Sequence, residues 1–281
     1  MDVYAPSGAQ GLPLVVVLPP HGMTKDDSAA YAQLATAVAE QGAVVAVANW
    51  SQLDDPPEVF TDPAALAEIS GLGQSLAGCA VSYAAEHAEE YGADPSRLVL
   101  AGELFGANAA SLVALGTPDP FPDCAATTGW TAAGLVGVND DWLVLYPPLD
   151  QVAAAAVEAQ SPWALLSDAP KIPVALVVTE AGVTVSRRCG DRDADWMVLR
   201  DPSGAMRGRL DEVGAYGDGC VDLGDMAEAM AREMTARGFT AEVVRLTNPD
   251  GATESDEGAH LAEIGPADLA ALADTVAGLA G

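Results

Sequence analysis

The stretch Arg97-Leu98-Val99-Leu100-Ala101-Gly102-Glu103-Leu104-Phe105-Gly106-Ala107-Asn108-Ala109-Ala110 decides the fold of this chain. An apolar run ends at Gly102, and a run of small residues that favours a helix begins near Gly106. Glycine lacks the Cβ atom that would clash where the backbone turns sharply, and here glycines flank the turn on both sides. The stretch therefore predicts a strand, a tight turn that contains Leu104, and a helix.

Apolar runs and helical patterns alternate along the rest of the chain. A continuous apolar run is typical of a parallel strand that is buried on both faces, and strands that alternate with helices indicate a parallel sheet. We therefore expect an α/β fold in which helices cover both faces of a doubly wound, mainly parallel sheet, giving three layers, α/β/α. The expected strands are 12–18, 43–48, 97–101, 132–138, 171–178 and 241–246, and the expected helices are 28–41, 63–91, 106–115, 223–237 and 266–279.

We expect one domain over residues 1–281, with an irregular insertion at about 183–221 that is rich in Gly, Asp and Arg. Half of the basic residues of the chain lie within this insertion. They either neutralise nearby aspartates, or they form a positively charged lid that favours an anionic ligand. The arginines are Arg187, Arg188, Arg192, Arg200, Arg207 and Arg209, and the aspartates are Asp191, Asp193, Asp195 and Asp201.

Acidic residues dominate the charge, with 41 Asp and Glu against 12 Lys and Arg and a net charge of −29. This balance argues against binding to nucleic acid or to anionic membranes. The acids are spread along the chain, which favours salt adaptation (a halophilic protein) or compositional bias. No apolar run reaches the roughly 18–20 residues of a membrane span. The first residues show no signal peptide, so we expect either a cytoplasmic protein or the mature chain of a secreted one.

The four cysteines show no metal-type CxxC spacing, which argues against a zinc cluster. An even number permits two disulfides, for which sequence order suggests Cys189–Cys220 and Cys79–Cys124. Such bridges would imply an oxidising compartment. Four buried free thiols are the alternative.

Three local motifs occur in an informative order. They are Pro20-His21-Gly22 after the first buried strand, Gly102-Glu103-Leu104-Phe105-Gly106, and His260 after the last strand. Together with the order of elements, they resemble the α/β-hydrolase fold, specifically its carboxylesterase and dienelactone-hydrolase-like members. The resemblance covers nearly the whole chain outside 183–221, and it implies a compact version, because the front strands of a full-length member are largely missing.

The resemblance implies that the nucleophile has been lost. In this family the turn reads Gly-x-Ser-x-Gly and holds a serine hydroxyl above the sheet. The corresponding residue here is Leu104, whose side chain has no ionisable or hydrogen-bonding atom. Glu103 matches esterases that read Gly-Glu-Ser-x-Gly, which supports the alignment, and Phe105 is bulky enough to crowd an acyl pocket.

The remaining site positions also follow from the resemblance. His260 takes the place of the triad histidine. Glu180, or alternatively Asp191 or Asp193, stands near the place of the acid. Backbone N–H groups would form the oxyanion hole, which is a pair of donors that stabilises a negatively charged oxygen. Those backbone donors belong to Gly22, Met23 and Phe105, and the other expected pocket residues are His21, Trp50 and Glu103.

We therefore expect an esterase-like protein without serine-hydrolase activity that keeps a pocket for a small molecule, an ester or a carboxylate, and needs no cofactor or metal. The first alternative is an active ester hydrolase in which His260, with Glu103 or Glu180, activates water. A metal held by His21, His260 and a carboxylate is a weaker variant of it. The second alternative is a structural or partner-binding protein. The sequence leaves the oligomeric state open.

Overall fold

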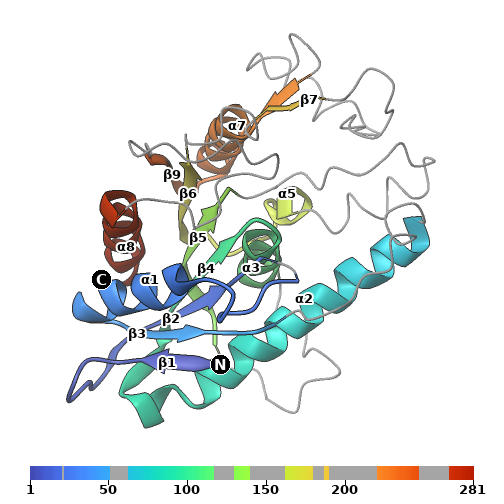
Figure 1. Cartoon of the computed structure of the whole chain (residues 1–281). Coiled ribbons are helices and arrows are strands. Elements are labelled where there is room, and N and C mark those ends of the chain that lie inside the picture. Colours follow the sequence, from blue (N-terminus) through green and yellow to red (C-terminus); the bar gives the residue numbers. More distant parts are fainter. Residues whose placement is uncertain are drawn as a thin grey trace.

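The computed structural model describes residues 1–20, 22–50, 63–116, 130–139, 162–179, 187–189, 220–246 and 266–281. Within these residues, seven strands form one sheet in the order β1-β3-β2-β4-β5-β6-β9 (Figure 1). The short edge strand β1 runs antiparallel to β3, and the other neighbouring pairs of this sheet are parallel. The expectation of a mainly parallel sheet is confirmed. The strands are β1 (Asp2–Tyr4), β2 (Leu12–Leu18), β3 (Val44–Val47), β4 (Ala93–Glu103), β5 (Ala132–Val138), β6 (Pro173–Thr179) and β9 (Thr240–Leu246).

Helices cover both faces of the sheet. Alternate side chains of β2 show why: Val15 and Val17 pack toward one helix layer, whereas Leu14, Val16 and Leu18 pack toward the other. All five side chains are buried, and each contributes about 1.5–3 kcal/mol through removal of its surface from water. The first layer contains α1 (Ala29–Glu40) and α8 (Pro266–Ala280), and the second contains α2 (Pro63–Glu86), α3 (Phe105–Leu115) and α7 (Leu223–Ala236). The three-layer α/β/α architecture is therefore confirmed.

The long helix expected over 63–91 is interrupted near its end. The α-helix stops at Glu86, and a 3₁₀ turn, η2 (Ala88–Tyr91), follows it. Gly92 then takes a left-handed conformation with φ 79. A Cβ at this position would lie 2.1 Å from the carbonyl oxygen of Ala9, so this close crossing requires glycine. Strand β4 begins directly afterwards at Ala93, four residues earlier than the apolar pattern predicts.

Several smaller features complete the described parts. A short helix, α5 (Pro162–Leu165), precedes β6, and none of the described helices is long and apolar enough to cross a membrane. The strands β7 (Arg187–Cys189) and β8 (Cys220–Asp222) form a separate antiparallel pair whose backbone register places residue 189 opposite residue 220. Cys79 on α2 is disulfide-bonded. Residue 124 lies outside the described residues, so the pairings stay predictions, as does the extent of the insertion at 183–221.

Candidate functional site

The turn after β4 is tight and strained. Leu104 has φ 50 and ψ −122, a region that residues with a Cβ rarely adopt and that costs on the order of 1–3 kcal/mol. Its N–H donates to the carbonyl oxygen of Val138 at 2.9 Å, and its own carbonyl accepts from the N–H of Asn108 at 3.0 Å. Backbone hydrogen bonds on both sides thus hold Leu104 between the end of β4 and the first residue of α3.

The two glycines of the motif are needed for this turn. A Cβ at Gly102 would lie 2.3 Å from the carbonyl oxygen of Gly106, and a Cβ at Gly106 would lie 2.2 Å from that of Leu18. These are backbone atoms that cannot rotate away, so the start of α3 packs directly on the end of β2. The sequence prediction of a strand, a sharp turn and a helix is confirmed.

The position of the turn in the sheet is where α/β proteins bind ligands. After β2 the chain moves to β3 on one side of it, and after β3 it returns to β4 on the other side. The two crossovers run to opposite sides of β2, so the carboxyl ends of β2 and β4 lie at a topological switch point, where open α/β sheets bind ligands. Leu104 is half-buried and Phe105 is 41% exposed at this edge, so a ligand here would meet alkyl and aromatic groups.

Glu103 lies beneath the turn rather than at its surface. Its side chain is fully buried (0% exposed), and the Tyr31 hydroxyl of α1 donates a 2.6 Å hydrogen bond to Oε2. Burial, and then the nearby Glu103 carboxylate, strongly raise the pKa of Tyr31, so the phenol keeps the proton that it donates. This contact supports a structural role for Glu103 rather than direct contact with a ligand. Tyr31 belongs to no local motif, and in the sequence only the apolar pattern of α1 marks it as a core residue.

Two hydrogen bonds to backbone carbonyl groups hold the loop after β2. Gly22 has φ 77, and the Met23 N–H donates to the carbonyl of Pro20 at 3.1 Å, which closes a turn. The buried indole of Trp50 donates to the carbonyl of Pro19 at 2.7 Å. The loop is therefore tied to the end of β3, and the N–H of Met23 serves the turn in this structure.

A buried amide joins the ends of β5 and β6. Asn139 has φ 49, and its side chain donates to Thr179 Oγ1 at 2.9 Å and accepts from the Thr179 N–H at 3.0 Å. Asparagine tolerates this left-handed conformation better than most residues, which is the signal in the sequence that could have identified it. The contact fixes the point from which the chain leaves β6 toward residue 180.

The structure brings some of the predicted site residues together. Gly22, Met23, Trp50, Leu104 and Phe105 lie at the carboxyl ends of β2, β3 and β4, with Glu103 beneath them. In the part of the chain that the structure describes, no group of three or more His, Cys, Asp or Glu could hold a metal ion. His21, Glu180, Asp191, Asp193 and His260 lie outside the described residues.

Comparison with known proteins gives a consistent fold. No family model and no curated protein matches the chain. A butyrate-bound thermophilic esterase from Thermogutta terrifontis is 17% identical with a TM-score of 0.62, covering 97% of this chain and 86% of that one. A thermostable esterase from Pseudomonas putida is 18% identical with a TM-score of 0.55, covering 99% and 77%. An esterase from Pyrobaculum calidifontis is 16% identical with a TM-score of 0.55, covering 99% and 80%. The chain therefore has the α/β-hydrolase fold.

Proposed function

We propose that this chain is an esterase-like protein that binds a small ester or carboxylate at the turn after β4 and does not carry out serine-based acyl transfer. The observation that carries the proposal is the backbone of Leu104, with φ 50 and ψ −122. In active relatives this turn presents a serine, whereas leucine has no atom that attacks a carbonyl. The strained turn supports a site that keeps its shape without its nucleophile.

The surroundings of the turn indicate the class of ligand. Leu104 and the exposed ring of Phe105 offer apolar surface beside the start of α3. The N-terminal end of a helix favours negative charge, because its first backbone N–H groups point outward. An apolar surface beside such a helix end suits a short acyl chain joined to a carboxylate or ester oxygen. Propionate-bound and butyrate-bound forms of the Thermogutta esterase carry ligands of this class.

The roles of the individual residues follow the same proposal. We place one oxyanion donor at the backbone N–H of Phe105 and a second at Gly22. Met23 would join them only if its bond to Pro20, at 3.1 Å, opened. His260 would occupy the base position and Glu180 that of the acid, and without serine at 104 neither completes acyl transfer.

The test is the turnover of short-chain p-nitrophenyl esters, at low and high salt, by the native protein and by Leu104→Ser. Leu104→Ala is the matched control, because it removes the same side chain without supplying a hydroxyl. We expect the native protein and Leu104→Ala to be inert and Leu104→Ser to gain turnover that a serine-directed inhibitor abolishes. Saturation-transfer NMR with butyrate tests binding separately, and butyrate should contact the native protein.

The opposite result would favour the alternative hydrolase. If the native protein turns over esters in the presence of a serine-directed inhibitor, and His260→Ala abolishes that turnover, a water molecule activated by His260 performs the reaction. The burial of Glu103 and its bond to Tyr31 make it a poor carboxylate partner for that step, which leaves Glu180 for the role.

A further inference from the structure

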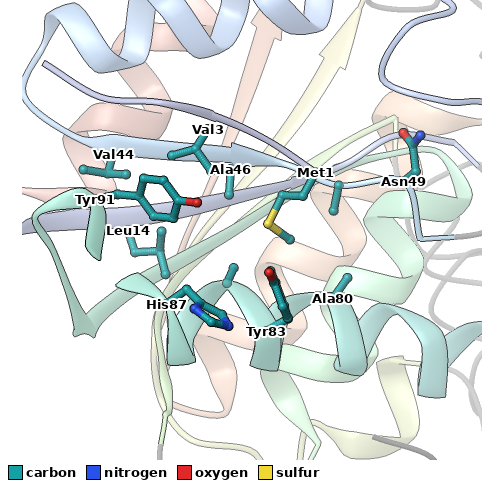
Figure 2. Close-up of a pocket in the computed structure, with 12 residues that line it drawn as sticks. Met1, Val3, Leu14, Val44, Ala46, Asn49, Ala80, Tyr83, His87 and Tyr91 are labelled. Atoms are coloured by element: carbon teal, nitrogen blue, oxygen red, sulfur yellow. The ribbon is translucent and has the colours of Figure 1, made fainter. Parts of the chain in front are cut away.

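A hollow lies on the α2 side of the sheet, between that helix, the edge strand β1 and its neighbour β3 (Figure 2). Its volume is about 360 Å³, and none of the residues that line it belongs to the turn after β4. Small-molecule sites typically have about 300–1,000 Å³. Two alanines of β3 and its end, Ala46 and Ala48, face two alanines of α2, Ala80 and Ala84, across it. Because the side chains on both sides are small, they leave a space between α2 and β3 that larger side chains would fill in a close-packed core.

Aromatic side chains stand around the mouth of this hollow. Tyr83 on α2 is 53% exposed and Tyr91 on η2 is 44% exposed, which is unusual for side chains that bury so much apolar surface elsewhere. The rings of Tyr83 and His87 lie 4.4 Å apart at 42°. Figure 2 shows Tyr83 and His87 on the helix side, with Tyr91 and the side chain of Met1 across the hollow from them. The mouth therefore offers π faces above an apolar floor.

Glutamates lie close to this hollow in the sequence, although none of them is among the residues that line it. Glu86, Glu89 and Glu90 are exposed on the last turn of α2 and on η2, and Glu90 contacts His87 Nδ1 at 2.7 Å. The described residues that line the hollow include no lysine, arginine, aspartate or glutamate, and Met1 among them carries the α-ammonium group of the chain. The ammonium group of Lys25, on the loop after β2, is bound 2.8 Å from a carboxylate oxygen of Asp2 and 2.8 Å from one of Asp26. With a net charge of −29, the chain attracts cations and repels anions.

We propose that this hollow binds a small amphipathic organic cation: a protonated or quaternary ammonium group carried on an aromatic or short aliphatic body. The body fills the floor between the alanines of β3 and those of α2. The ammonium group lies against the faces of Tyr83 and Tyr91, where the ring quadrupole attracts it, and the glutamates add long-range attraction. The site is independent of the ester or carboxylate site proposed above, and its ligand has the opposite charge.

The experiment compares three probes of similar size by isothermal titration: benzyltrimethylammonium, neutral benzyl alcohol and anionic benzoate. We expect the cation to bind most tightly. Tyr83→Leu, which keeps apolar bulk but removes the ring, should weaken binding of the cation about two- to fivefold, as expected for one exposed cation–π contact. Tyr83→Phe, which keeps the ring and removes only the hydroxyl, should bind as the native protein does.

Charge variants separate a defined site from general attraction. Glu86→Gln removes an exposed charge from the end of α2, next to His87 in the sequence, whereas Glu40→Gln removes the same charge from α1 on the other face of the sheet. Only Glu86→Gln should weaken binding. Equal effects of these two variants, equal affinity for benzyl alcohol, or native affinity in Tyr83→Leu would each overturn the proposal. If Tyr83→Leu does not fold, ring-proton shifts in the native protein decide instead: benzyltrimethylammonium should shift Tyr83, His87 and Tyr91, and shifts elsewhere only would overturn it.

Discussion

The hydroxyl of Tyr31 lies 2.6 Å from Oε2 of Glu103, so a phenol of α1 holds the carboxylate that directly precedes the strained turn. Both side chains are buried. The contact joins α1, in the layer that α1 forms with α8, to the end of β4. Tyr31 and Glu103 are 72 positions apart in the chain. The local geometry at Leu104 therefore rests on tertiary packing as well as on the glycines of the motif.

The first prediction concerns this hydrogen bond. Tyr31→Phe removes one hydroxyl and leaves a buried carboxyl group without this donor, which costs about 1–3 kcal/mol in the free energy of unfolding. Urea denaturation measures it. Tyr83→Phe is the control, because that hydroxyl belongs to a largely exposed side chain, and it should change stability by less than about 0.5 kcal/mol. Equal stability of the two variants would show that Tyr31 contributes only its ring.

The second prediction concerns alkaline pH. The pKa of Tyr31 is raised by burial and by Glu103 above its ordinary value of 10.0. Above about pH 10 the unfolded chain releases this proton and the folded chain does not, so the unfolded state binds fewer protons and stability falls as pH rises. Below pH 10 the contribution of Tyr31 is complete.

Comparison with Tyr31→Phe isolates that contribution. Between about pH 10 and 11, the stability of the native protein should fall more steeply than that of the variant, by about 1.4 kcal/mol per pH unit once the unfolded phenol is ionised. Urea titrations at several alkaline pH values measure the two slopes. Parallel slopes would mean that Tyr31 ionises equally in both states.

The third prediction separates the glycines by their surroundings. Gly106→Ala places a Cβ 2.2 Å from the carbonyl oxygen of Leu18, so the backbone must move, and we expect a loss of stability above about 3 kcal/mol or failure to fold. Gly278→Ala is the matched control. It lies in α8, and nothing stands within 4 Å of its added Cβ, so it should stabilise the protein by about 0.5–1 kcal/mol. Similar midpoints of thermal unfolding for the two variants would contradict this geometry.

The fourth prediction concerns the amide that joins β5 to β6. Asn139→Gly keeps the left-handed conformation but removes the buried side-chain hydrogen bonds to Thr179, which should cost about 1–3 kcal/mol. Asn139→Ala loses the same bonds and also strains the backbone at φ 49, so it should be about 1 kcal/mol less stable than the glycine variant. Denaturant titration of both variants measures the difference. The reverse order of stability would show that the backbone conformation at 139 relaxes freely.

The sequence predicted the strands of the sheet where apolar residues are continuous. The runs at 12–18 and 132–138 match β2 and β5 at both ends, because a strand that is buried on both faces accepts few residues that are not apolar. It did not predict that β4 begins at Ala93, since Asp94, Pro95 and Ser96 interrupt the apolar pattern there. Ala93 and Asp94 pair with Leu12 and Pro13 of β2, and the register shifts directly after them, which is a tertiary effect.

The site was predicted as far as local motifs reach. Gly102 and Gly106 identified the turn because their spacing expresses a local steric need. Tyr31 and the pair of Asn139 and Thr179 depend on contacts between distant segments, which no local pattern records. The hollow beside α2 was missed for a related reason: Ala80 and Ala84 read as ordinary core alanines, and only the structure shows that alanines also stand opposite them.

The conformation of the turn after β4 depends on the residues around Leu104 and not on the Leu104 side chain. The glycines at 102 and 106, the carbonyl of Val138 and the N–H of Asn108 fix the path of the backbone, and the side chain of Leu104 takes no part in any of these constraints. The side chain at position 104 can therefore be exchanged without changing the interactions that fix the backbone. A substitution at residue 104 can therefore change which functional group the turn carries while these backbone constraints stay in place.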